Sequence, residues 1–317
     1  MVNNTVVTEF ILQGFSDMRE LQILHFMVFL SLYLATLMGN FLIITSVAMI
    51  PHLHTPMYFF LAVLSSVDIC FISSTVPTSM VNSLRNDNRI SFEGCVVQVF
   101  CVIACATAEL SLLAVMAYDR FVAICHPLRY MLIMNWNACF QMTAAALVFS
   151  LINGITQTAN TFRLQFCWQV VEQYFCDIPQ LLRLSCTDTQ FNEIFNFACV
   201  LTMGAVGSVF LLVSYSCIFS TVFKIQSGQG KYKAFSTCIP HLTMFSLFAF
   251  TVMFSYMRPK EMSSLSVDLF AAILYAILPP LMNPIIYTLR NKDIQAALRK
   301  RTGVKATWWT QRASPRR

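Results

Sequence analysis

Charge is scarce in this sequence: Asp, Glu, Lys and Arg together make up only 11% of its 317 residues. Apolar residues take 57% of the chain, with 28 Phe among them, and the mean hydropathy is +0.63. An ordinary soluble domain is about 45–50% apolar, so this composition argues against one. It favours a membrane protein.

The sequence also lacks the motifs of several functional classes. It contains no HExxH motif, no Gly-rich phosphate loop and no nucleophile paired with a base inside an apolar segment, so nothing in it indicates an enzyme. Internal repeats, which are typical of many transporters, do not occur. Nor do the short alternating segments of about ten residues that a membrane β-barrel requires.

What the chain has instead is seven long apolar segments. Each is about 20 residues or longer, which is enough for a helix to cross a hydrocarbon core of about 30 Å. The segments are residues 23–50, 57–81, 95–118, 138–159, 194–223, 234–257 and 269–289. The sequence therefore predicts an all-α membrane protein, a single bundle of seven transmembrane helices.

Basic residues predict the orientation of this bundle, because Lys and Arg concentrate in cytoplasmic loops. With the amino end outside, 14 of the 21 basic residues fall on the cytoplasmic side. They are Arg120, Arg129, Lys224, Lys231, Lys233 and all those from Arg290 onward. We therefore expect a multi-pass protein of the plasma membrane, with an extracellular segment 1–22, a bundle 23–290 and a cytoplasmic segment 291–317.

The two terminal segments carry further signals. The first 20 residues have neither the basic nor the apolar part of a cleavable signal, so the first span is expected to be an uncleaved anchor. Asn3 begins an Asn-Asn-Thr triplet, an acceptor sequence for N-glycosylation that the predicted topology permits to be used. Residues 290–300 predict a short amphipathic helix, basic on one face and suited to anionic lipid, followed by a basic tail.

The 12 cysteines fall into two groups. Eight lie within or near the apolar segments, where small buried thiols are expected. The other four, on the predicted outer side, are Cys95, Cys167, Cys176 and Cys186. An even number of cysteines on an oxidising face predicts two disulfides, and four cysteines allow three pairings. The sequence alone cannot choose among the three; the pairing taken as the working expectation is Cys95 with Cys176 and Cys167 with Cys186, and the alternative is Cys95 with Cys186.

Five motifs, in this order and spacing, resemble those of the olfactory receptors, which belong to the rhodopsin-like G-protein-coupled receptors. They are "LHTPMYFFL" at 53–61, "MAYDRFVAICHPLRY" at 116–130, "SYSCIF" at 214–219, "KAFSTCIPHL" at 233–242 and "PPLMNPIIYTLRN" at 279–291. The resemblance extends over almost the entire chain. It implies an odorant receptor that activates a heterotrimeric G protein of the stimulatory, olfactory type and raises cyclic AMP. A membrane transporter or channel is the alternative.

The resemblance also implies an activation switch. Asp119 and Arg120 would form an ion pair that holds the resting state, although such a pair could also serve only to anchor the helix. Tyr215 and Tyr287 would meet near Arg120 in the active state, or else act as interfacial anchors. The switch and coupling residues that it implies are Asp119, Arg120, Tyr215, Lys233, Asn283, Pro284 and Tyr287.

Two acids lie deep within predicted spans, where ionised groups are costly and usually face the bundle interior. They are Asp68 and Glu109, which the family pattern sets near Asn40 and Asn283. Either a sodium ion or a shared proton would compensate their charge, and the alternative is a hydrogen-bonded cluster that only sets helix packing. Apart from that sodium ion, the sequence predicts no cofactor and no metal.

Ligand is expected between the outer halves of spans three, five, six and seven, again by resemblance. The candidate residues are Val102, Ile103, Ala106, Thr107, Cys199, Met203, Val252, Tyr256, Ile273 and Ala276. Amine-binding relatives have an aspartate at the position of Val102, so a cation gains no obvious counter-charge there. We therefore expect a small, weakly polar, volatile ligand. Any one of these residues could equally serve plain helix packing.

The sequence departs from the family pattern at one position beside the activation switch and at one position near the expected ligand. Phe121 replaces the tyrosine that usually follows the arginine. Ala249 stands where olfactory receptors often have a tyrosine that senses ligand, so this chain lacks the aromatic ring at that position.

Overall fold

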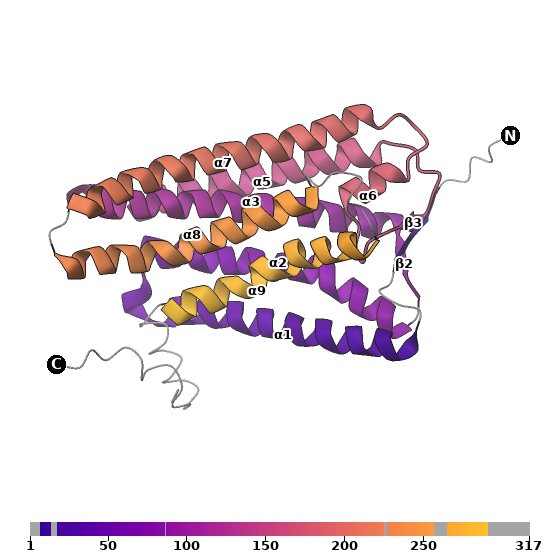
Figure 1. Ribbon diagram of the computed structural model, residues 1–317, viewed down its shortest axis with the longest axis horizontal. Coiled ribbons are helices and arrows are strands. Elements are labelled where there is room, and N and C mark those ends of the chain that lie inside the picture. The colour runs from indigo at the N-terminus through magenta and orange to yellow at the C-terminus, as the bar shows by residue number, and fades with distance from the viewer. Residues whose placement is uncertain (1–6, 14–17, 86, 225–226, 257–264, 291–317) are drawn as a thin grey trace.

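The computed structural model describes residues 7–13, 18–85, 87–224, 227–256 and 265–290. Within these ranges, seven helices are long and apolar enough to cross a membrane. They are α1 (Arg19–Met49), α2 (Pro56–Arg85), α3 (Phe92–Cys125), α5 (Trp136–Phe162), α7 (Gln190–Lys224), α8 (Gly228–Tyr256) and α9 (Leu265–Arg290). They run roughly along the long axis of the molecule, with α3 in contact with α2, α5, α7 and α8 (Figure 1).

Each of the seven apolar segments predicted from the sequence falls on one of these helices, apart from Ile50, which follows α1, and residue 257, which lies outside the described residues; this confirms the all-α bundle. Most helices also extend beyond the apolar segment, because polar groups at their ends satisfy backbone atoms. Ser91 accepts a hydrogen bond from the Gly94 N–H at the start of α3, and Asn135 does the same for Ala138 at the start of α5. Such side-chain caps pair the donors that the first helical turn leaves open.

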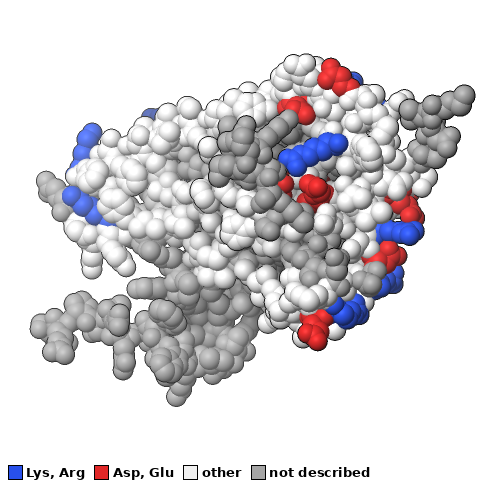
Figure 2. Space-filling view, turned by 45° about the vertical axis from the view of Figure 1, so that its right-hand side comes forward, with Lys and Arg blue, Asp and Glu red and all other residues white. Residues whose placement is uncertain are grey.

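Among the described residues, four short helical elements lie between the long ones. They are η1 (Pro51–Leu53), η2 (Pro127–Arg129), α4 (Tyr130–Ile133) and α6 (Ile178–Arg183). On the face seen in Figure 2, the exposed charged side chains lie mainly toward the two ends of the molecule, with largely uncharged surface between them. An uncharged surface of this kind is what a bundle in lipid requires, since ionised groups at hydrocarbon depth are costly.

A small sheet, which the sequence did not predict, covers one end of the bundle. It has the strand order β2 (Arg89–Ser91), β1 (Glu9–Leu12) and β3 (Val170–Val171), with β1 antiparallel to β2 and parallel to β3. Phe10 and Leu12 of β1 are buried while Glu9 and Ile11 face outward, as the two-residue period of a strand dictates. We call this end of the bundle the sheet end, and the opposite end, where α3 finishes, the Asp119 end.

Close packing between α1 and α9 depends on Gly39 and Asn40. A Cβ atom at Gly39 would lie 2.8 Å from Cγ of Pro284, so only glycine permits this approach. Pro284 has no N–H and cannot pair with the carbonyl of Pro280, four residues earlier. The buried Asn40 side chain donates to that carbonyl instead, at 3.0 Å. Asn40 thus compensates for the hydrogen bond that the helix loses at its proline.

Candidate functional site

A cavity of about 300 Å³ lies between α3, α5, α7 and α8, nearer the sheet end. Most of its wall is apolar, built from Ile103, Leu110, Met203, Phe248 and Val252 among others. Ala249 also lines it, so a small methyl group stands where a larger ring would take up part of the space. A volume of this size is at the lower end of those found for ligand pockets, which are typically apolar with a few polar groups.

Four polar residues of the cavity, Thr107, Asn153, Gln157 and Asn196, come from α3, α5 and α7. Asn153 of α5 donates to the hydroxyl of Thr107 on α3 at 2.9 Å. Gln157 and Asn196 complete this set. The carbonyl oxygen of the Asn196 side chain is buried without a hydrogen-bond partner among the described residues. A ligand with a hydroxyl group could donate to that oxygen, which would otherwise remain unpaired at a cost of about 1–3 kcal/mol.

The structure places seven of the ten expected ligand residues on the wall of this cavity. They are Ile103, Ala106, Thr107, Cys199, Met203, Val252 and Tyr256. The other three, Val102, Ile273 and Ala276, do not line it. They belong instead to an apolar cluster that also includes Tyr174 and Phe175 of the loop after α5.

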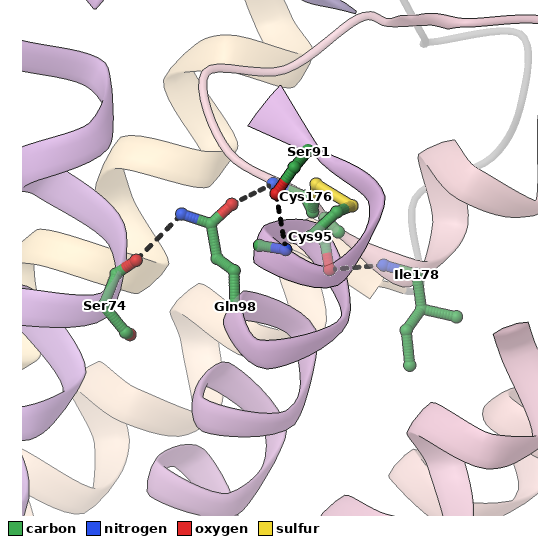
Figure 3. Close-up of a disulfide and its surroundings, with 8 residues drawn as sticks. Ser74, Ser91, Cys95, Gln98, Cys176 and Ile178 are labelled. Atoms are coloured by element: carbon green, nitrogen blue, oxygen red, sulfur yellow. Dashed lines mark hydrogen bonds between the residues drawn. A yellow bond between two sulfur atoms is a disulfide. The ribbon is translucent and has the colours of Figure 1, made fainter. Parts of the chain in front are cut away.

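The loop that follows α5 is held over the cavity by two disulfides, Cys95–Cys176 and Cys167–Cys186. These are the pairs taken as the working expectation. Gln98 of α3 strengthens the first attachment, because it accepts from the Cys176 N–H at 2.8 Å and donates to the Ser74 carbonyl at 2.8 Å (Figure 3). Loop, α2 and α3 are therefore tied together beside the cavity.

Tyr256 of α8 connects the cavity to the same loop. Its hydroxyl donates to Asp177 at 2.8 Å, and the Asp177 side chain also accepts from the Ile178 N–H at 2.9 Å as the cap of α6. Asp177 has no basic partner among the described residues, and burial raises its pKa to about 6 despite these two donors. At neutral pH the carboxylate is therefore mostly ionised in a poorly solvated place.

The two predicted membrane acids lie together with Asn283 in the middle of the bundle. Asn283 donates to Asp68 at 2.7 Å and to Glu109 at 3.3 Å, and all three side chains are buried. One oxygen of each side chain has no hydrogen-bond partner among the described residues. These orphaned oxygens form a donor set that fits a hard cation such as sodium, and it equally fits a proton shared between the acids.

Asp119 and Arg120 form an ion pair at the opposite end of α3. Asp119 is fully buried, and one of its carboxylate oxygens accepts from Nε and Nη2 of Arg120. The other oxygen accepts from the hydroxyl of Tyr130 on α4 at 2.7 Å. Burial and the Asp119 charge raise the pKa of the Tyr130 hydroxyl, so it keeps the proton that it donates. Both oxygens of the buried carboxylate are thus satisfied.

A second contact near this end joins α3, α7 and α8. The Tyr215 hydroxyl is 2.8 Å from Nδ1 of His241, and Nε2 of His241 is 2.7 Å from the carbonyl oxygen of Leu113. The carbonyl only accepts, so Nε2 carries the proton of a neutral ring and Nδ1 accepts from Tyr215. Tyr287 of α9 is buried too, and its hydroxyl has no partner among the described residues.

Some expected residues fall outside the described part of the chain or at its margin. Asn3 and the segment 291–317, with its expected helix, lie outside the described residues. Lys233 lies in α8, and its side chain is not described. Pro284 lies inside α9, which continues through it.

Sequence reasoning missed several residues of the site, among them His241, Asn153, Gln157 and Asn196. His241 lies in the motif "KAFSTCIPHL", and a histidine within an apolar span was the signal that could have assigned it a role. Asn153, Gln157 and Asn196 are amides near the ends of spans four and five. Only the packing of α5 and α7 against α3 brings them to the cavity, so no local pattern in the sequence indicated their role.

Comparison with known proteins agrees with this geometry. Residues 29–304 match the family model described as "Olfactory receptor". Olfactory receptor 14C36 of Homo sapiens is 49% identical over 301 residues, which cover 95% of this chain and 96% of that protein. Olfactory receptor 5T7 of Mus musculus is 44% identical over 301 residues, covering 95% and 97% respectively. The chain therefore belongs to the olfactory receptor family, multi-pass G-protein-coupled receptors without enzymatic activity.

Proposed function

We propose that this receptor binds a small, mostly apolar odorant in the cavity beside α3 and activates a heterotrimeric G protein at the Asp119 end. The G protein is of the stimulatory, olfactory type, and cyclic AMP is the product of the pathway. The observation that carries the proposal is that one helix joins both places. Thr107 lines the cavity and Asp119 lies 12 residues further along α3, about 18 Å at 1.5 Å per residue.

The sheet end faces the outside of the plasma membrane in this proposal. Disulfides persist on the oxidising side, and both disulfides lie at the sheet end. Basic residues of the other end, Arg120 and Arg129 among them, fit the cytoplasmic side. Segment 1–22 is then extracellular with Asn3 open to glycosylation, 23–290 is the bundle, and 291–317 lies against the inner leaflet.

The ligand is a molecule with an apolar body and one hydrogen-bonding group. The apolar wall excludes nothing by charge, but the polar set of Thr107, Asn153 and Asn196 offers a fixed point for a hydroxyl or carbonyl. Cys199, Met203 and Val252 surround the apolar part. Because Ala249 leaves space at α8, ligand contact with this helix falls mainly to Phe248, Val252 and Tyr256.

Activation is a shift between two populations of the bundle. An odorant that binds better when α8 has moved favours that state by the difference in its affinity for the two. The resting state holds Asp119 against Arg120 and Tyr130, and Tyr215 against His241. Release of both contacts frees Arg120 and Tyr215 to meet the G protein or each other, and Tyr287 supplies an unpaired hydroxyl to the same place.

The docking surface for the G protein comprises Arg120, the ends of α7 and α8 nearest to it, and Lys233. Asn283 and Pro284 give α9 the freedom to bend at this end, since the proline removes one helical hydrogen bond. A sodium ion or a proton held between Asp68 and Glu109 favours the resting state, and it leaves when the bundle contracts around it.

The experiment is a screen of volatile compounds against cells that express the receptor, with cyclic AMP as the readout and surface expression measured in parallel. Substitution of Ala106 by Leu or of Met203 by Ala should change which odorants activate. Val206→Ala is the matched control, because Val206 is also on α7 but is 70% exposed on its lipid-facing side. Selectivity that is unchanged in both cavity variants would refute the cavity as the ligand site.

A further inference from the structure

A second cavity, of about 420 Å³, lies outside the first one, between the loop after α5 and the ends of α6, α7, α8 and α9. The two cavities share Asn196, Val200 and Tyr256 as walls. We call them the outer and the inner cavity. Tyr256 is the boundary between them, since its ring lines both and its hydroxyl is held by Asp177.

The outer cavity carries an excess of negative charge. Its described lining residues include three carboxylates, Asp177, Glu193 and Asp268, and one cation, Arg183. Arg183 is already engaged, because its Nη1 lies 3.7 Å from Asp268 and 3.9 Å from Glu172. Figure 2 shows acidic side chains around a basic one on the face turned forward. Asp177 keeps its charge without an ion-pair partner among the described residues.

The unsatisfied neutral groups of this cavity are acceptors as well. Gln173 and Asn196 are 5% and 8% exposed, and both line the outer cavity. Their side-chain carbonyl oxygens have no hydrogen-bond partner among the described residues. The amide nitrogen of Gln173 is directed elsewhere, to the backbone carbonyl of Asp268 at 3.2 Å. The cavity therefore has two amide oxygens without donors and one carboxylate, Asp177, without an ion-pair partner among the described residues.

An ammonium group supplies what these acceptors lack. It has several N–H donors and one positive charge, and it needs no rearrangement of Arg183. A metal ion fits less well, because the described residues contain no cluster of three or more His, Cys, Asp or Glu side chains. The inner cavity, which begins on the other side of Tyr256, accepts an alkyl chain.

We infer that the outer cavity binds the ammonium group of a primary alkylamine at Asp177, with the alkyl chain reaching past Tyr256 into the inner cavity. The inference rests on the proposed function for the inner cavity and extends its ligands to cations. It also revises the expectation drawn from Val102. The counter-charge comes from the loop after α5 instead of from α3.

The strength of the contact follows from burial. Asp177 is 6% exposed, so its attraction for an ammonium group is only weakly screened by water. A charge-assisted contact of this kind is expected to improve affinity by about tenfold or more over a neutral group of the same size. The Tyr256 hydroxyl competes for the same carboxylate at 2.8 Å, so its removal should strengthen amine binding.

The test compares hexylamine with hexanol, two ligands of nearly equal size, by calorimetric titration of the purified receptor in lipid nanodiscs at neutral pH. Wild type should bind hexylamine at least about tenfold more tightly than hexanol. Asp177→Asn should abolish this preference by weakening hexylamine alone, because asparagine can still accept from Tyr256 and Ile178. Tyr256→Phe should increase the preference.

Glu193→Gln is the matched control, since it removes a carboxylate from the exposed rim of the same cavity. Its preference for hexylamine should stay within about twofold of wild type because water screens an exposed charge. Equal affinity for the two ligands in wild type, or an equal loss in Glu193→Gln and Asp177→Asn, would overturn the inference. Because binding is measured without a G protein, failure to raise cyclic AMP would count against the proposed function only.

Discussion

Removal of the Tyr130 hydroxyl should raise signalling in the absence of odorant. In the resting structure this hydroxyl donates to the fully buried Asp119 carboxylate at 2.7 Å, while Arg120 occupies the other oxygen. Tyr130→Phe leaves the ring in place and deprives one carboxylate oxygen of its donor. The loss falls on the resting state, because the proposed active state has already released Asp119.

The magnitude can be worked out from the type of bond. A hydrogen bond to a charged group contributes about 1.5–3 kcal/mol, and Tyr130 is only half-buried, so the lower figure applies. About 1.4 kcal/mol changes an equilibrium tenfold. A receptor that is about 1% active at rest would become about 10% active, within the range typical of minor states.

The assay is cyclic AMP in cells without odorant, normalised to the amount of receptor at the surface. Tyr118→Phe is the matched control, because Tyr118 lies one residue before Asp119 and the hydrogen bonds to the Asp119 carboxylate come from Arg120 and Tyr130. Basal signalling that is unchanged in Tyr130→Phe, or that rises equally in Tyr118→Phe, would refute the role given to this contact.

Three further predictions concern the cavity, the bundle and the loop. Gly204 lines the inner cavity, and a Cβ atom there meets nothing within 4 Å, so Gly204→Leu should fill part of this cavity. In a homologous series of odorants, potency should then fall about fourfold, or about 0.8 kcal/mol, for each methylene that no longer fits. Asn40→Ala should lower the free energy of unfolding by about 1–3 kcal/mol, because the buried Pro280 carbonyl loses its donor. Thermal unfolding in nanodiscs measures this, with the exposed Ser31→Ala as the control. Equal melting temperatures of the two variants would contradict the prediction. The pKa of Asp177 is raised to about 6 from an ordinary 3.8, so the folded receptor binds the Asp177 proton more tightly than the unfolded chain does. The stability that this proton contributes is therefore fully present below about pH 4 and is lost as the pH rises through about 6. Thermal unfolding of wild type should show this decline, by at most about 3 kcal/mol, and a decline of the same size in Asp177→Asn would rule out Asp177 as its source.

The spans could be predicted because lipid imposes a simple rule on them. A hydrocarbon core requires about 20 apolar residues per helix, and each of the seven predicted segments meets that requirement. The ends of the helices followed a different rule. Arg19, for example, extends the start of α1 before the apolar segment because it donates to the carbonyls of Ser83 and Leu84, at the end of α2. No local pattern in the sequence encodes that contact.

The sheet was missed because its strands are very short and come from distant parts of the chain. β3 has two residues, and its partner β1 lies about 160 residues earlier. Period-two patterns cannot be detected over two residues. Pairing of this kind depends on the disulfides and the bundle bringing the segments together.

The ligand residues could be predicted where helices alone form the cavity wall, but not where side chains of the loop after α5 pack against the helices. Ile103, Ala106 and Thr107 lie on the face of α3 that the helical period turns toward the cavity. Val102 lies instead in an apolar cluster to which Tyr174 and Phe175 of the loop after α5 also belong. Where a loop places its side chains is set by tertiary contacts, so no local pattern in the sequence signalled this placement.

The central claim is that binding at the sheet end is transmitted through α3 to Arg120. The most direct test is Arg120→Ala, with odorant binding to the purified receptor and odorant-evoked cyclic AMP in cells measured on the same variant. The account predicts that binding persists with a Kd within about threefold of wild type, because Arg120 lies 10 residues, about 15 Å, beyond the last α3 residue of the cavity wall, Leu110, while the cyclic AMP response is lost. A full response from correctly displayed Arg120→Ala receptor would contradict it.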